Sequence, residues 1–204
     1  MDVTLSLAAL QKKLLPEPSA LPLSPARGDF DLNPAARPAA GRLLRPAAVL
    51  IPIVARSEPM VLFTKRAEHL TRHPGQVSFP GGMAEAQDVS LTATALRELE
   101  EETGITAAFV SVAGYLDPYE TVTGFAVQPV VGLLSEGFVV VSDAREVDVV
   151  FEVPLAFLLH PASLEEQRLD FQGQRRRVYA FHYEGHYIWG ATAAILVNLR
   201  ERLA

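Results

Sequence analysis

The sequence predicts an α/β domain that follows an N-terminal leader. Short apolar runs typical of strands recur along the chain, one strongly amphipathic helix is expected at 90–103, and an apolar helix closes the chain at 192–203. Mixed strands with few helices favour helical layers around one sheet. The 204 residues, 49% of them apolar, suffice for one domain with a sizeable core.

The leader is expected to span residues 1–45, before a domain at 46–204. Leucines recur at helical spacing in residues 4–15, which predicts a short amphipathic helix. Prolines are then frequent from Pro16 to Pro46 and exclude a long helix there. This stretch is interpreted either as an extended arm wrapped over the domain or as a mobile leader.

The domain itself is expected to begin with a hairpin formed by 47–55 and 60–64, because Arg-Ser-Glu-Pro separates these two apolar runs. In the helix at 90–103, apolar side chains form one stripe, and Gly104 stands where a C-terminal cap belongs. The other expected elements are strands at 77–79, 109–116, 125–134 and 137–141, a short helix at 154–159, a hairpin at 167–183 and the closing helix at 192–203.

Composition excludes several classes of function. The net charge of -6 argues against nucleic-acid binding driven by bulk electrostatics. The absence of cysteine excludes disulfides, thiolate zinc sites and cysteine nucleophiles. The histidines form no metal-binding pair on one helix face, so a metal site should consist of oxygen ligands, which suits Mg²⁺ or Mn²⁺.

The sequence also indicates no membrane partner. The longest apolar stretch, 125–141, is interrupted by Gln128, Pro129, Ser135 and Glu136 and is too polar to span a bilayer. The N-terminus lacks the pattern of a signal peptide. We therefore expect a cytoplasmic protein. The sequence does not determine the oligomeric state, and a homodimer remains open.

The most informative segment is the end of the helix at 90–103. Glu98, Glu101 and Glu102 share one helix face, where like-charged pairs each cost about 0.2–0.5 kcal/mol. The negative end of the helix dipole adds to this repulsion, and a divalent cation would compensate for both. Taken alone, a glutamate-rich helix is usually a solvated face, but the upstream turn with Gly81 and Gly82 can present backbone groups to a phosphate or a metal.

At this point the sequence resembles the Nudix hydrolases, whose signature is G-x5-E-x7-R-E-U-x-E-E-x-G-U, where U is a bulky aliphatic residue. The sequence departs from it at Asp88, which replaces the first glutamate and is followed by eight residues, not seven, before the arginine. An extra residue in the loop before the helix accommodates this. The matching residues are Gly82, Arg97, Glu98, Leu99, Glu101, Glu102, Gly104 and Ile105.

The resemblance implies a Nudix-type α/β/α sandwich with a mixed sheet and a set of catalytic roles. Glu98, Glu101 and Glu102 would bind Mg²⁺ or Mn²⁺ together with the carbonyl of Gly82. Arg97 would orient the carboxylates through charge-assisted hydrogen bonds. Glu98 is the first choice if one glutamate acts as the general base instead. A later loop often supplies a further acidic residue, for which Glu120 and Glu146 are candidates.

The stretch before the glycine turn resembles the signature of the coenzyme A pyrophosphatases within this family, L-L-T-x-R-S-x3-R-x3-G-x-V-x-F-P-G-G. The departures are Phe63 for leucine, Ala67 for serine, and Thr71 with Arg72 adjacent in place of the second arginine. The residues that agree are Leu62, Thr64, Arg66, Gly75, Val77 and 79–82. This resemblance implies hydrolysis of coenzyme A, its thioesters or its oxidised form to 3′,5′-ADP and 4′-phosphopantetheine.

Coenzyme A is a polyanion, and a chain of net negative charge needs local cations to hold it. The candidate substrate-binding residues are Lys65, Arg66, Arg72, Gly81 and Gly82, next to His69 and His73. A hydrated surface loop is the simpler interpretation of any single one of these cations. The run Arg175-Arg176-Arg177 is interpreted as a solvated turn rather than a substrate clamp, and Trp189 as a packing residue rather than a stacking partner of adenine.

Two other functions remain open from the sequence. One is a Nudix pyrophosphatase that acts on ADP-ribose, NADH or a dinucleoside polyphosphate. The other is a non-catalytic module that retains the fold and binds a nucleotide. The intact Glu98, Glu101 and Glu102 favour an enzyme, because a module without activity is free to lose them.

Overall fold

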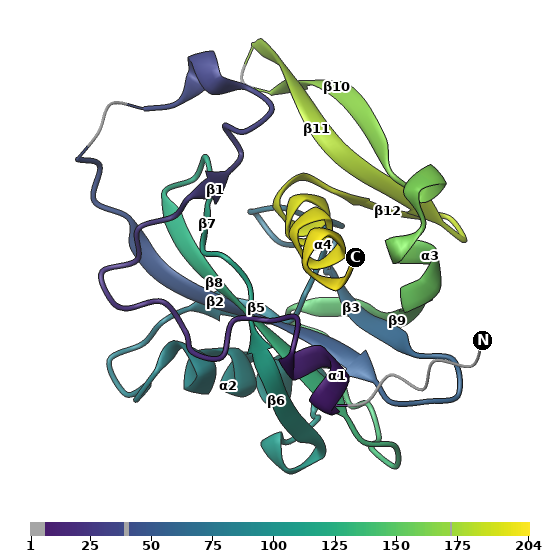
Figure 1. Ribbon diagram of the computed structural model, residues 1–204. Helices are drawn as coiled ribbons and strands as arrows, with labels where there is room; N and C mark the ends of the chain where they lie inside the picture. Colours follow the sequence, from purple (N-terminus) through teal and green to yellow (C-terminus); the bar gives the residue numbers. More distant parts are fainter. Residues whose placement is uncertain (1–6, 39–40, 172) are drawn as a thin grey trace.

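The computed structural model describes residues 7–38, 41–171 and 173–204 (Figure 1). Within these residues, nine strands form a main sheet: β1 (Arg27–Gly28), β2 (Arg45–Val54), β3 (Met60–Arg66), β4 (Val77–Ser78), β5 (Gly81–Met83), β6 (Val110–Tyr115), β7 (Tyr119–Glu120), β8 (Phe125–Leu134) and β9 (Val147–Pro154). A second sheet contains β10 (Glu165–Phe171), β11 (Gln174–Tyr183) and β12 (His186–Trp189). The α-helices are α1 (Leu7–Gln11), α2 (Leu91–Thr103), α3 (Leu155–Leu159) and α4 (Gly190–Leu203).

The main sheet is mixed, with β2 at its centre. Strand β2 runs parallel to β8 from the pair Arg45↔Phe125 to the pair Val54↔Leu134, and it runs antiparallel to β3 and β5. The path across the sheet is β1-β7-β8-β2-β3-β4, while β6 pairs with β8 and β9 with β3. The expected hairpin at the start of the domain is therefore confirmed as β2–β3.

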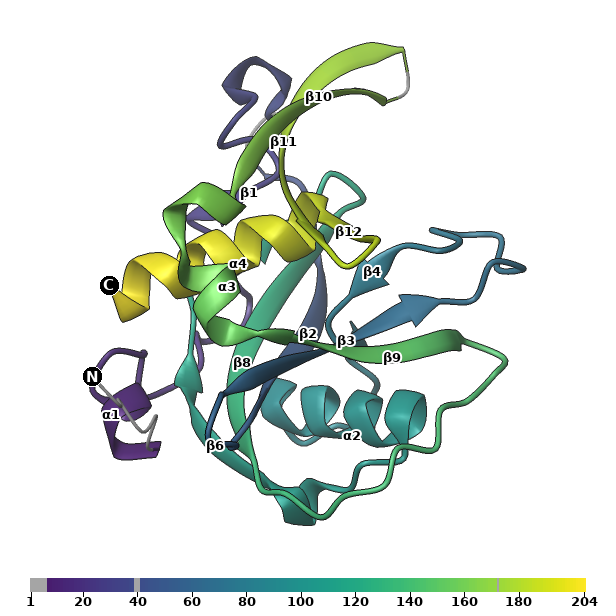
Figure 2. The same ribbon diagram turned by 90° about the vertical axis from the view of Figure 1, so that its right-hand side faces the viewer.

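Both faces of the main sheet are covered. Successive side chains of a strand point to opposite faces, so Ile51 and Ile53 of β2 pack into one core and Leu50 into the other. Helix α2 packs on one side, whereas α4 and the second sheet pack on the other (Figure 2). The predicted α/β/α layering around a mixed sheet is confirmed.

Helix α2 has the ends that its sequence predicts. The Ser90 hydroxyl accepts a hydrogen bond from the backbone N–H of Ala93 at the N-terminus. Gly104 ends the helix at φ 73°, a left-handed conformation that glycine adopts without strain. Leu91 and Leu99 are buried against the sheet, and in the last turns Glu102 is buried as well, whereas Glu100 and Glu101 are exposed.

The described part of the leader lies against the domain (Figure 1). Leu10, Leu14 and Phe30 are buried, and β1 runs parallel to β7 through the pair Gly28↔Glu120. Helix α1 covers residues 7–11 of the helix expected at 4–15. Residues 12–15 are not helical, because the chain turns there and Leu15 forms a bridge with Tyr115, and residues 4–6 lie outside the described residues. The arm interpretation therefore holds for residues 7–38.

The strands differ from the expectations in three ways. Residues 137–141 form no strand, because this loop runs along the end of α2, where the Val141 N–H donates to the Thr103 carbonyl, and Val139 and Val141 are exposed. Strand β9 was missed, since Asp148 and Glu152 interrupt its apolar pattern. The hairpin at 167–183 is present as β10–β11, but it forms a second sheet with β12 instead of joining a single one. None of the helices in the described residues is both long and apolar enough to cross a membrane.

Candidate active site

The glycine turn is pressed against both the sheet and α2. A Cβ on Gly81 would lie 2.6 Å from the carbonyl oxygen of Ala48, and one on Gly82 would lie 2.2 Å from Oε1 of Glu98. The contact with the backbone of Ala48 requires glycine at position 81, whereas a side chain at position 82 would displace the carboxylate of Glu98. Strand β5 thereby holds the backbone of residue 82 in contact with a carboxylate of α2.

Glu102 is the most buried carboxylate of the helix. Its side chain accepts hydrogen bonds from the Thr64 hydroxyl of β3 at 2.9 Å and from the Gly81 N–H at 3.5 Å. Only 4% of the residue is exposed. Burial raises the pKa of Glu102 to about 7, although the two hydrogen bonds oppose this rise. Glu102 thus carries a negative charge at neutral pH only at a cost, which a nearby cation would offset.

Arg97 connects three acidic side chains. Its Nη1 donates to Oε1 of Glu98 at 2.9 Å and to Oε2 of Glu101 at 2.8 Å. Its Nε and Nη2 donate to the two carboxylate oxygens of Asp88 at 3.1 and 3.0 Å. Arg97 therefore holds Glu98 toward the glycine turn and fixes the loop before α2 at the same time.

Asp88 has a structural role at the point where the signature departs from its usual spacing. It accepts hydrogen bonds from the Thr94 hydroxyl and the Glu85 N–H, both at 2.9 Å, in addition to those from Arg97. These bonds, above all the one from Arg97, lower the pKa of the Asp88 carboxyl well below its usual range. The extra residue lies in the loop before Ser90, so it leaves the helix register of Arg97 unchanged.

The three predicted metal ligands make different contacts. The pKa of Glu98 is raised mainly by burial, and the charges of Glu101 and Glu146 raise it further. Glu101 is exposed and Glu102 is buried against Thr64. Within the described ranges, no three acidic or histidine side chains already form a metal-binding group, because Arg97 engages Glu98 and Glu101.

The residues nevertheless fit a divalent cation. Glu98 and Glu102 are carboxylates whose pKa values burial raises, and the main chain of Gly82 touches Glu98. Such an all-oxygen set of donors matches Mg²⁺ or Mn²⁺. Of the two later candidates, Glu146 lies near enough to raise the pKa of Glu98. The main chain of Glu120 instead pairs with β1 and with the Asp29 N–H, far from α2.

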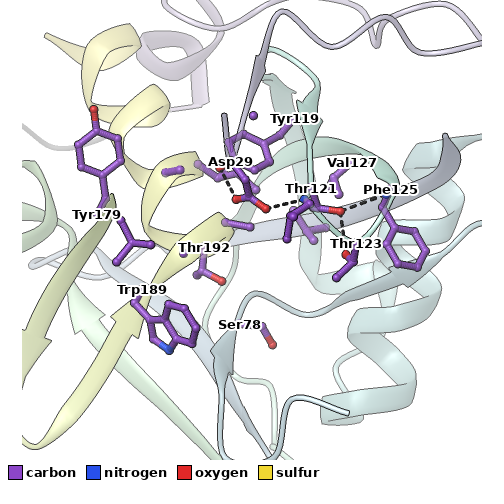
Figure 3. Close-up of a pocket in the computed structure, with 18 of the residues that line it drawn as sticks. Asp29, Ser78, Tyr119, Thr121, Thr123, Phe125, Val127, Tyr179, Trp189 and Thr192 are labelled. Carbon is purple, nitrogen blue, oxygen red and sulfur yellow. Dashed lines mark hydrogen bonds between the residues drawn. The ribbon is translucent and has the colours of Figure 1, made fainter. Parts of the chain in front are cut away.

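A cavity of about 580 Å³ opens at the glycine turn, and Gly81 and Gly82 line it, whereas Glu98, Glu101 and Glu102 do not. It begins at Arg66, Ser78, Gly81 and Gly82 and continues between α4, β8, β11 and the arm. Figure 3 shows Ser78 and Trp189 in one region and Asp29 with Tyr119 in another. This volume lies within the range of roughly 300–1,000 Å³ that is typical of small-molecule sites.

Of the predicted substrate-binding residues, Arg66, Gly81 and Gly82 line the cavity, whereas Lys65 and Arg72 do not. Alternation along β3 sends Lys65 to the other face, where its Nζ donates to Glu68 at 2.8 Å. Arg72 is exposed in the loop before β4. The Nε of Arg66 is buried and has no hydrogen-bond partner among the described residues.

Several cavity residues were not predicted as site residues. Trp189 lines the cavity instead of packing only in the core, and Arg176 and Arg177 line it instead of forming a solvated turn. Asp29 of the arm is a partly buried cavity residue that accepts hydrogen bonds from the Tyr119 hydroxyl and the Val122 N–H. For Trp189, the position directly before a helix was a sequence signal that could have indicated a site residue. The arm residues stand in no sequence pattern that indicates a place in the cavity.

The raised pKa of Glu102 predicts a pH dependence of stability in the metal-free protein. The folded state keeps this proton up to about pH 7, whereas the unfolded chain loses it near pH 4.5. The protonated Glu102 side chain therefore contributes its full stabilisation of the fold below pH 4.5, and this stabilisation is lost as the pH rises through 7. Relative to Glu102→Gln, the free energy of unfolding of the wild type should fall by roughly 3 kcal/mol across this window. Urea titrations of both proteins in EDTA at pH 4.5 and 8 measure this change. The same difference in the free energy of unfolding at both pH values would contradict the raised pKa of Glu102.

Comparison with known proteins identifies the family of the chain. The family model of the NUDIX domain matches residues 44–172, more than half of the chain. The uncharacterised Nudix hydrolase NudL of Yersinia enterocolitica is 46% identical over 157 residues, which cover 77% of this chain and 80% of that protein. The NudL protein of Yersinia pestis (strain Pestoides F) is 44% identical over 160 residues, 78% of this chain and 80% of its own.

Solved structures with a similar fold are more distant. An Ap4A hydrolase of C. elegans is 17% identical with a TM-score of 0.47, and the match covers 54% of this chain and 80% of that one. The NUDIX domain of Shewanella oneidensis NrtR, solved with ADP ribose, is 21% identical with a TM-score of 0.44 over 63% of this chain and 82% of that one. The domain match and the NudL relatives establish that the chain belongs to the Nudix family of hydrolases.

Proposed function

We propose that this Nudix hydrolase cleaves the pyrophosphate bond of coenzyme A in a reaction that requires Mg²⁺ or Mn²⁺. The products are 3′,5′-ADP and 4′-phosphopantetheine. The observation that carries the proposal is the near end of the cavity, where Arg66 lines the wall together with Gly81 and Gly82, and its charge acts on the carboxylate of Glu102 behind the glycine turn. A cation and a glycine turn backed by carboxylates suit a diphosphate that is bound together with a divalent metal ion.

In this proposal, Glu98, Glu101, Glu102 and the carbonyl of Gly82 bind the metal. The bound ion supplies charge neutralisation and lowers the pKa of water. The protein positions the other groups. Arg66 has a buried N–H donor without a partner among the described residues, which would be available to the diphosphate, and Arg97 orients Glu98. Glu146, or Glu98 if it does not bind the metal, would accept the proton of the attacking water.

The choice of substrate is supported by the residues of the coenzyme A signature, because they form the part of the structure that lies at the near end of the cavity. Thr64 holds Glu102, and Phe79 stacks on Phe63 with ring centroids 5.0 Å apart. Gly75 turns the chain back at φ 65°, and its N–H donates to the carbonyl of Arg66 at 3.1 Å. The signature therefore forms one β3–β4 unit that brings Arg66 and the glycine turn to the cavity.

A substrate panel tests the proposal. The wild type is incubated with Mg²⁺ and coenzyme A, ADP-ribose, NADH or a dinucleoside polyphosphate, and products are identified by mass spectrometry. We expect the highest kcat/KM for coenzyme A, with 3′,5′-ADP and phosphopantetheine as products. A higher kcat/KM for another compound would refute coenzyme A specificity. Metal-dependent nucleotide binding without turnover would instead indicate a non-catalytic module.

A further inference from the structure

The cavity has two regions, which differ in chemistry. Its near end, at β3 and β4, contains Arg66, His73 and the glycine turn beside the carboxylates of α2. Its far chamber lies between α4, β7, β8, β11 and the arm. Because β8 and β2 separate β7 from β3, the two regions lie roughly 14 Å apart, at about 4.8 Å per strand.

Several charged groups of the far chamber have partners within the protein. Asp29 accepts hydrogen bonds from the Tyr119 hydroxyl at 2.8 Å and from the Val122 N–H at 2.7 Å (Figure 3). It also interacts electrostatically with Arg176, and Arg177 forms an ion pair with Glu166. At the near end, the Gly81 N–H donates to Glu102 and the main chain of Gly82 touches Glu98, the two buried carboxylates of the proposed metal site. The phosphate groups that are bound together with the metal are therefore favoured at the near end.

The remaining wall of the far chamber is apolar. Ala191, Ala194 and Val197 are three residues apart and lie along one face of α4. Val127 of β8 and Val178 of β11 line the chamber as well. Burial of apolar ligand groups against such a surface stabilises a complex, whereas burial of an additional charge there does not.

The arm closes the chamber on its outer side. The side-chain amide of Asn33 donates to the carbonyl of Arg177 and accepts from the N–H of Arg177, each at 2.9 Å. This pair of bonds, here called the clasp, joins the arm to β11. On its other side the arm pairs with β7 through Gly28↔Glu120. The chamber wall is thus held by contacts that span the main sheet and the second sheet.

We propose that the far chamber binds the uncharged limb of the substrate, the pantetheine chain with a thiol or thioester at its end. The diphosphate and the additional phosphate remain at the near end. This inference rests on the proposed function, which it deepens by assigning the S-acyl end to the apolar wall. It also makes the arm a part of the substrate site and Ala194 a determinant of acyl-chain specificity.

Binding measured without metal tests the assignment. Isothermal titration calorimetry in EDTA uses S-hexanoyl-pantetheine and 3′,5′-ADP as the two probes. In Ala194→Leu, the larger side chain should weaken S-hexanoyl-pantetheine binding by about tenfold or more and leave 3′,5′-ADP binding nearly unchanged. Ala108→Leu, at an exposed alanine outside the cavity, is the matched control and should bind both probes like the wild type.

A second variant guards against a folding defect of Ala194→Leu. Asn33→Ala removes the clasp without filling the chamber and should also weaken S-hexanoyl-pantetheine selectively. If both variants bind that probe as tightly as the wild type, or lose affinity for both probes equally, the chamber assignment is wrong. If coenzyme A is not hydrolysed but the selective loss is observed, the proposed function fails and the chamber assignment survives.

Discussion

Replacing Glu102 by glutamine is expected to lower kcat for coenzyme A by about 10²–10⁴-fold while the protein still folds. The carboxylate is buried between Thr64 and Gly81, so no other group can take its place. Glutamine has nearly the same shape, but it lacks the charge and one of the two acceptor oxygens. Steady-state kinetics with Mg²⁺ measure the loss, and circular dichroism verifies the fold.

Glu100→Gln is the matched control for this substitution. Glu100 lies on the same helix, but its side chain is exposed, whereas that of Glu102 is buried. We expect its kcat to stay near that of the wild type. Activity of Glu102→Gln close to that of the control would remove Glu102 from the reaction and refute the proposed metal ligands.

Replacing Arg97 by glutamine is expected to reduce the free energy of unfolding by about 3–5 kcal/mol. The Asp88 side chain is only 6% exposed and loses two hydrogen bonds from Arg97. Its charge would then remain buried without its main partner. Urea denaturation at pH 7 measures the change, and kcat should fall in the same variant because Glu98 loses its orienting contact.

Arg145→Gln provides the comparison. Arg145 also pairs with an aspartate, Asp143, but its side chain is 89% exposed. An exposed pair contributes about 0–1 kcal/mol, so this variant should unfold almost like the wild type. Equal stability losses in the two variants would show that the contact between Arg97 and Asp88 is no stronger than a surface ion pair.

Local signals in the sequence predicted much of the fold. Helix α2 was predicted because its stripe of leucines and its Gly104 cap are encoded within a few residues, and β2–β3 because a polar turn separates two apolar runs. Long-range pairing has no such signal. The sequence could not show that β10–β11 forms a second sheet or that β1 pairs with β7, since each depends on partners distant along the chain.

In the candidate site too, some residues could be predicted from local sequence signals and others could not. The helical spacing placed Glu98, Glu102 and Arg97 on neighbouring positions of α2, and the sequence also indicated that the glycine turn at residues 81 and 82 lies against them. The basic cluster was less predictable. Alternation along β3 separates Lys65 from Arg66, and only the latter reaches the cavity. The far chamber could not be predicted, because the arm and α4, which line it, are distant in the sequence and meet only in the folded protein.

The most direct test of the metal site is a titration of Mn²⁺ into the protein, followed by the electron paramagnetic resonance signal of free Mn²⁺. If divalent ions relieve the repulsion among the α2 carboxylates, the wild type and Glu100→Gln should deplete free Mn²⁺ equally. Glu98→Gln and Glu102→Gln should bind it at least about tenfold more weakly. Equal depletion by all four proteins would contradict this metal site.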